Sequence, residues 1–193
     1  MKKTLGTLLA LVLAVTSFAL HASPPEGWIL AGSKPANYET GTDSLNSFSS
    51  RPSAFLKAKA DSEGFGTLMQ SFSAVPYRAK RVRMSAWVKS EAVSRWAGLW
   101  MRIDGPLQGN APQMLGFDNM QNRPIKNTSN WQRYDVVLDV PQAASGISFG
   151  ILLDGPGEVW MNSVEFSSVG LEVPTTATAP LVPDGPRNLS LEK

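Results

Sequence analysis

The sequence predicts an all-β protein that folds as an antiparallel β-sandwich of about eight strands. Apolar and polar residues alternate with period two in five segments between residues 81 and 166, which is typical of half-buried strands. No stretch of useful length has the period of an amphipathic helix. Asp-Gly-Pro tripeptides at 104–106 and 154–156 close two of these segments, and such residues favour turns.

The two clearest strands are predicted at 81–89 and 98–104, and each has one apolar face. The apolar positions of the first are Val82, Met84, Ala86 and Val88. Its other face carries Arg81, Arg83, Ser85, Trp87 and Lys89. In the second strand, Leu99, Met101 and Ile103 alternate with Trp100, Arg102 and Asp104. We expect the apolar face of each strand to pack in the core.

Three further strands are predicted at 134–140, 147–153 and 159–166. Weaker candidates lie at 54–59, 65–75 and 114–120. Residues 23 to about 52 are rich in Pro, Gly, Ser, Asn and Thr, so we expect irregular structure there, with room for one short strand.

Both ends of the chain are predicted to lie outside the sandwich domain, which covers 23–170. Residues 1–22 combine a cationic start, an apolar run and a small residue before Ser23, the pattern of a bacterial Sec-type signal peptide. The apolar run is short for a membrane span, so we expect a periplasmic or secreted protein with no stable membrane anchor after cleavage. Residues 171–193 hold four prolines and three threonines and are predicted to form a flexible tail.

Composition excludes several classes of protein. The 193-residue chain has no cysteine, and its single histidine, His21, lies in the predicted signal peptide. A mature protein without either residue type has no disulfide, no Ser–His or Cys–His hydrolase mechanism and no histidine metal site. We therefore expect no metal and no other cofactor. Loss of Lys2 and Lys3 would leave sixteen basic and sixteen acidic residues, and this balance gives no electrostatic reason to expect nucleic acid as a partner.

Several stretches of the sequence resemble the jelly-roll modules of the galactose-binding-like, carbohydrate-binding-module-like type. They are EGFGTLMQSFSAVPYRAKRVRMSAWVKSE, WAGLWMRIDG, LGFDNMQNRPIKNTSNWQRYDVVLDVP and ISFGILLDGPGEVWMNSVEF. The pattern W-x-x-Y-x-V-x-L-x-V at 131–140 and G-x-V-W at 157–160 are similar to the closing strands of such sandwiches. The resemblance spans about residues 28–168 and implies a jelly roll. Similar modules are also found appended to AraC-type bacterial transcriptional regulators, although this sequence shows no helix-turn-helix segment.

Tryptophan and its polar neighbours indicate where a ligand would bind. Sugars stack their CH faces on indole rings, while carboxylates, amides and guanidinium groups bind the flanking hydroxyls. Trp87, Trp100 and Arg102 lie on the polar sides of two predicted strands and would form one patch if those strands pair. Asp118 and Asn119 add polar groups to an otherwise apolar run, and complete the predicted ligand-binding set. Three alternatives stay open: a loop covers the tryptophans, Arg102 forms an ordinary surface ion pair with Asp104 or Asp118, or Asp118 and Asn119 cap a turn.

These residues favour a secreted, non-catalytic β-sandwich that binds a carbohydrate or a similar polar ligand on one sheet face. The alternative is an envelope protein-interaction or structural module without a small ligand, whose partner is another envelope protein. A glycosidase- or lyase-like enzyme is a third hypothesis, and it needs two facing carboxylates. Among the acidic candidates, only Asp118 has no explanation in turn chemistry or exposure, so we predict no catalytic residue.

Overall fold

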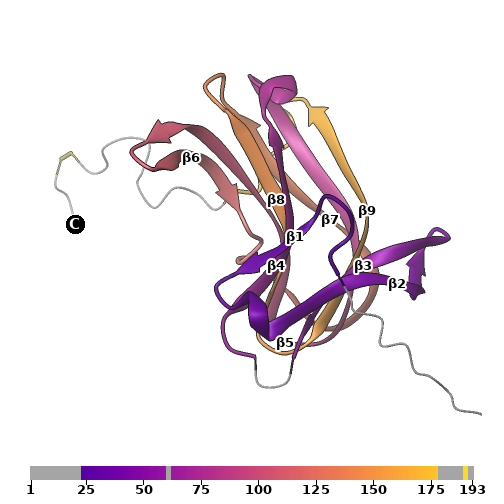
Figure 1. Ribbon diagram of the computed structural model, residues 1–193. Helices are drawn as coiled ribbons and strands as arrows, with labels where there is room; N and C mark the ends of the chain where they lie inside the picture. The colour runs from indigo at the N-terminus through magenta and orange to yellow at the C-terminus, as the bar shows by residue number, and fades with distance from the viewer. Residues whose placement is uncertain (1–22, 60–61, 178–188, 191–193) are drawn as a thin grey trace, which may run out of the picture.

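The computed structural model, which describes residues 23–59, 62–177 and 189–190, is an antiparallel β-sandwich (Figure 1). The predicted fold class is confirmed. The predicted signal peptide lies outside the described residues. In chain order the elements are β1 (Ile29–Gly32), the 3₁₀ turn η1 (Pro35–Asn37), β2 (Tyr38–Phe48), β3 (Arg51–Ala58), β4 (Phe65–Ser73), the 3₁₀ turn η2 (Val75–Tyr77), β5 (Lys80–Gln108), β6 (Ala111–Asp118), β7 (Ile125–Val140), β8 (Gly146–Asp154) and β9 (Glu158–Val169).

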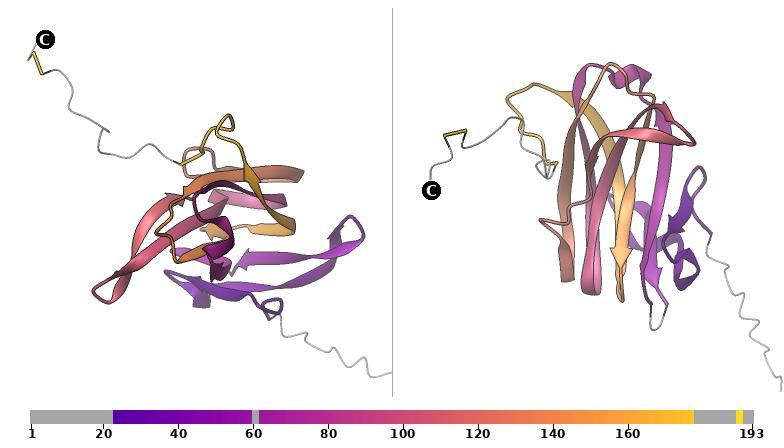
Figure 2. Two further views of the ribbon diagram at one scale, coloured as in Figure 1. Left: turned by 90° about the horizontal axis from the view of Figure 1, so that it is seen from above. Right: turned by 90° about the vertical axis from the view of Figure 1, so that its left-hand side faces the viewer.

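The strands form two layers that share the long strand β5 (Figure 2). The first half of β5 pairs with β7 and β9, and β9 continues to β3 and β2. We call this the β9 layer. The second half of β5 pairs with β8 and β6, and β8 continues to β4 and β1. We call this the β8 layer. Each layer therefore has an inner face toward the core and an outer face toward solvent.

The passage of β5 from one layer to the other explains why the sequence indicated two strands there. Its register against β7 shifts three times between Val88 and Ala97, and Ala92 has a left-handed φ of 50°. Bulges of this kind bend a strand and change which positions face outward. Odd-numbered residues of β5 point outward before the bend, and even-numbered residues point outward after it.

The core lies between the two layers and is built from the apolar positions that the alternation indicated. Leu99, Met101 and Ile103 in β5 are completely buried. Aromatic rings connect the layers: Phe166 of β9 lies 4.8 Å from Phe149 of β8 and 5.2 Å from Phe72 of β4, measured between ring centroids. Burial of this apolar surface is the main source of stability in a chain without disulfides.

The two regions outside the predicted strands are more ordered than the sequence indicated. Residues 23–52 contain β1, all of β2 and the start of β3, in place of mainly irregular structure. At the other end, the Thr176 N–H donates a hydrogen bond to the Val137 carbonyl at 2.9 Å, and Arg81 donates to the carbonyls of Leu171 and Val173. Residues 171–177 therefore pack on β7, and most of the remaining predicted tail lies outside the described residues. Within the described ranges, no helix is long and apolar enough to span a bilayer.

Candidate functional site

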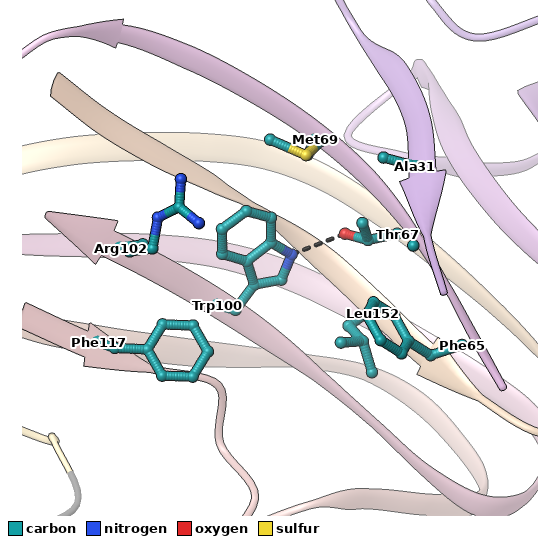
Figure 3. A pocket seen from close by; sticks show the side chains of 9 residues that line it. Ala31, Phe65, Thr67, Met69, Trp100, Arg102, Phe117 and Leu152 are labelled. Atoms are coloured by element: carbon teal, nitrogen blue, oxygen red, sulfur yellow. Dashed lines mark hydrogen bonds between the residues drawn. The ribbon is translucent and has the colours of Figure 1, made fainter. Parts of the chain in front are cut away.

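Trp100 lies on the outer face of the β8 layer, where a hydrogen bond holds its ring across the sheet. The indole Nε1–H donates to Thr67 Oγ1 at 2.7 Å (Figure 3). That hydroxyl in turn donates to the carbonyl of Ile151 at 2.9 Å. Gly150 of β8 lies between Trp100 of β5 and Met69 of β4, its partners in the two neighbouring strands. Because glycine has no side chain, nothing from β8 stands between the Trp100 and Met69 side chains at this position. A Cβ at Gly150 would lie 2.2 Å from the Leu68 carbonyl oxygen, which explains the glycine.

A hollow of about 320 Å³ surrounds this indole on the outer face of the β8 layer (Figure 3). Its volume is near the lower end of the range for small-molecule sites, about 300–1,000 Å³. Its residues are Ala31, Gly32, Phe65, Thr67, Met69, Trp100, Arg102, Phe117 and Leu152. Alternate residues of neighbouring strands project to the same face, which is why β4, β5, β6 and β8 all contribute. The lining is mainly apolar, and Phe117 is the most accessible of its aromatic rings, with 38% of its surface exposed.

Arg102 supplies the only charge in the lining of this hollow, and Asp104 partly neutralises it. The Arg102 Nε lies 2.9 Å from Asp104 Oδ1, and Nη2 donates to Oδ2 at 3.1 Å. The Asp104 side chain is mostly buried, whereas the guanidinium side chain is 41% exposed. Arg102 therefore remains the one polar side chain in the hollow that reaches solvent.

The structure brings together two of the five predicted site residues, Trp100 and Arg102. Trp87 lies on the outer face of the β9 layer, because β5 changes layer between these tryptophans. There it stacks on Phe48, with ring centroids 4.7 Å apart and an interplanar angle of 27°. Phe48 also contacts Trp131 at 5.3 Å. The expected single patch of Trp87, Trp100 and Arg102 is therefore split between opposite faces.

Asp118 and Asn119 have local structural roles beside the hollow. The Asp118 side chain is fully buried and forms an ion pair with Arg123 at 2.6 Å. It also accepts hydrogen bonds from the Met120 N–H at 2.9 Å and from Thr176 Oγ1 at 2.6 Å. Asn119 Oδ1 accepts from the Gln121 N–H at 3.2 Å. This geometry matches the turn-capping alternative, and it engages both oxygens of Asp118 within the protein.

Sequence reasoning gave Phe117 no role of its own and missed six other residues of the hollow, namely Ala31, Gly32, Phe65, Thr67, Met69 and Leu152. Phe65 and Met69 come from β4, which alternation indicated only weakly, and Leu152 comes from β8. The signal that could have identified them is which residues of each strand face outward, the odd-numbered or the even-numbered ones. Residues that alternate with buried ones in neighbouring strands must share an outer face. The sequence did not show the order of the strands in the sheet, which determines the strands that lie next to one another.

The outer face of the β9 layer has a second hollow, of about 570 Å³, with different chemistry. Its residues are Glu39, Thr42, Asp43, Ser44, Phe55, Lys57 and Glu158. Lys57 Nζ lies 3.3 Å from Glu158 Oε2. Burial raises the pKa of Glu158, and the ammonium of Lys57 opposes this shift. Across the described ranges, no group of three or more His, Cys, Asp or Glu side chains is placed to hold a metal ion.

Comparison with known sequences finds one close relative. No family model matches the chain. The chain is 44% identical over 173 residues to the uncharacterized HTH-type transcriptional regulator YbfP of Bacillus subtilis, a match that covers 87% of this chain and 57% of the regulator. The chain thus spans little more than half the length of that curated relative.

Solved structures with the same fold include several carbohydrate-binding modules. The CBM22-1 xylan-binding domain of Paenibacillus barcinonensis Xyn10C superposes with a TM-score of 0.54 and 15% identity, covering 77% of this chain and 90% of that domain. A family 30 carbohydrate-binding module gives a TM-score of 0.55 at 13% identity, with 77% and 95% covered. The C-terminal family 22 module of Clostridium thermocellum Xyn10B gives 0.53 at 8%, with 75% and 87% covered. These likenesses show a common β-sandwich fold.

Proposed function

We propose that this chain is a secreted, non-catalytic module that binds a carbohydrate in the hollow on the outer face of the β8 layer. The observation that carries the proposal is the hollow itself, an open and mainly apolar depression with the rings of Phe65, Trp100 and Phe117 in its lining. Aromatic and apolar surfaces with a few placed polar groups are the usual chemistry of small-ligand sites. The fold shared with xylan-binding and other carbohydrate-binding modules supports this choice of ligand.

Phe117 is the ring on which a sugar would stack, because it combines exposure with a place at the rim of the hollow. Trp100 is only 7% exposed and its N–H is already bonded, so it would form the floor. Arg102 would bind a hydroxyl or carbonyl oxygen at the edge. The non-catalytic part of the proposal is supported by the burial of Asp118 and by the engagement of both its oxygens with protein donors.

The test compares one phenylalanine on each outer face. In glycan-array and isothermal titration experiments on residues 23–193, we expect Phe117→Ala to weaken glycan binding at least about fivefold, because truncation of a stacking ring costs about 1–3 kcal/mol by analogy with other stacked ligands. Phe55→Ala removes a ring from the hollow of the β9 layer and is expected to leave the dissociation constant unchanged. The reverse result would place the glycan on the β9 layer, and no binding by the wild type would reject the proposal.

A protein-interaction role is a second candidate, and exposed apolar residues beside the hollow favour it. Leu107 and Met114 on the β5–β6 hairpin are 72% and 60% exposed, and Ile29 of β1 also reaches solvent. Apolar patches of this kind mark protein contacts as well as ligand grooves. This candidate predicts a partner that co-purifies without glycan and is lost when Leu107 and Met114 are both replaced by Ser.

A further inference from the structure

The hydrogen-bonding groups of the hollow on the β8 layer restrict the kind of sugar that it can accept, an inference that rests on the proposed function. We propose that the hollow selects sugars that carry an acetyl group, as an ester or an amide, over the same sugars with free hydroxyls. The methyl group would enter the apolar part of the hollow, and the acetyl carbonyl would accept a hydrogen bond from Arg102.

The first step is that the buried polar groups of the hollow already have partners. Trp100 Nε1 donates its one hydrogen to Thr67 Oγ1, and Thr67 donates its one hydrogen to the Ile151 carbonyl. Thr67 is 4% exposed. Neither side chain has a hydrogen left to donate to a sugar oxygen.

The second step concerns Arg102, which has donors to spare. Its Nε and Nη2 face the carboxylate of Asp104, whereas the described part of the chain offers no hydrogen-bond partner to Nη1. A guanidinium has five N–H donors and no acceptor. Arg102 can therefore bind the oxygen of a ligand, but it cannot accept a hydrogen from a hydroxyl.

The third step is the match between these groups and the two ligand classes. The one side-chain oxygen in the lining is Thr67 Oγ1, which is 4% exposed and already accepts from Trp100. A free hydroxyl that enters the hollow therefore finds no well-exposed side-chain acceptor for its hydrogen, and burial of an unpaired donor is unfavourable. An O-acetyl group has no such hydrogen, and the N–H of an acetamide lies on the sugar side of the carbonyl, so it need not enter the hollow with the methyl group. In both cases the one strong acceptor is the carbonyl oxygen. The remaining lining of Phe65, Met69 and Leu152 is apolar and gains from burial of a methyl group.

The experiment uses pairs of glycans that differ in acetylation. Chitohexaose and cellohexaose share a β-1,4-linked glucose backbone and differ in the acetamido group at C2. Acetylated xylan and the same xylan after alkaline deacetylation form a second pair. By isothermal titration with residues 23–193, we expect the acetylated member of at least one pair to bind at least tenfold more tightly, which corresponds to about 1.4 kcal/mol.

The failure of this inference is distinguishable from the failure of the proposed function. Equal or tighter binding of the non-acetylated member in every pair that binds would overturn the acetyl preference and leave carbohydrate binding in place. Absence of binding to all four probes and to a broad glycan array would overturn both.

Two substitutions test whether the preference arises in this hollow. Met69→Gln places an amide of similar size in the lining, and we expect it to reduce the ratio between acetylated and non-acetylated glycans at least threefold. Leu45→Gln is the control, because Leu45 is 97% exposed at the β2–β3 hairpin, away from the hollow. Circular dichroism confirms folding of both variants. An unchanged ratio in folded Met69→Gln would overturn the assignment of the preference to the hollow.

Discussion

The two outer faces of the sandwich use tryptophans of the same strand in different ways. On the β8 layer, Trp100 forms the floor of an open, mainly apolar hollow and is held by a single hydrogen bond. On the β9 layer, Trp87 stacks on Phe48, which also contacts the tilted ring of Trp131. Both residues lie on the polar sides of alternating segments. What separates their roles is the set of side chains that contact each ring, because Trp100 is itself only 7% exposed.

Hairpins account for this difference. The β2–β3 hairpin reaches the β9 face, where Phe48 stacks on Trp87 and Lys89 Nζ donates to Asn46 Oδ1 at 2.6 Å. The β5–β6 hairpin projects from the opposite side of the sandwich (Figures 1 and 2). It contributes Phe117 to the rim of the hollow and leaves the hollow open. The β2–β3 hairpin thus adds ring contacts to Trp87, whereas the face around Trp100 keeps an open and mainly apolar hollow. The hollow of the β9 face has a more polar and charged lining.

The largest effect expected from this comparison follows truncation of Trp100. Replacement of a buried tryptophan by alanine costs about 3–5 kcal/mol, and we expect a decrease of this size in the free energy of unfolding for Trp100→Ala. Urea denaturation followed by circular dichroism measures it. Trp100→Phe is the control, because it keeps an aromatic ring and loses the hydrogen bond to Thr67 with only part of the buried indole surface. A decrease below about 1 kcal/mol would show that the indole adds little to the fold and is free to serve the ligand alone.

A smaller effect is expected on the covered face. Phe48→Ala removes two ring contacts, each worth about 0.5–1.5 kcal/mol, so we expect destabilisation of about 1–3 kcal/mol. Tryptophan fluorescence should shift as Trp87 and Trp131 gain exposure, while glycan affinity stays at the wild-type value. Loss of glycan affinity in this variant would contradict the separation of the two faces.

The sequence was sufficient for the fold class and for the apolar side of each clear strand. Period-two alternation identified Leu99, Met101 and Ile103 as core, and they are completely buried. It also showed that the polar, outward-facing residues are odd-numbered in 81–89 and even-numbered in 98–104. A turn between two strands and a bulged passage between two layers both produce that reversal, so the alternation alone did not separate them.

The candidate site was less predictable because it depends on contacts between residues far apart in the chain. The sequence offered turn capping as a role for Asp118 but no distant partner, and its partners include Thr176, 58 residues further on. Likewise, Trp100 meets Thr67 across 33 residues, and only the order of β4, β8 and β5 brings them together. Alternation predicts which residues of a strand face outward. The order of the strands determines which of these residues become neighbours, and alternation does not predict that order.

The smallest effect expected from the comparison concerns acid stability and is confined to Asp43 on the covered face. Burial alone would raise the pKa of this carboxyl, but hydrogen bonds from the side chain and backbone of Asn46, from Trp160 Nε1 and from the Leu45 N–H lower it from 3.8 to about 2. A carboxyl whose folded pKa is depressed stabilises the protein above its unfolded pKa and loses that contribution as pH falls through the folded pKa.

The contribution of Asp43 should therefore be complete above about pH 4 and disappear between about pH 4 and pH 2. Asp43→Asn keeps the side-chain shape without the titration, so the stability difference between wild type and variant should shrink over this window in urea melts. A difference that stays constant from about pH 5 to about pH 2 would mean that the carboxylate of Asp43 does not hold the hairpin to Trp160, and the cover over the β9 face would then rest on the Phe48 stack and on the Lys89–Asn46 contact.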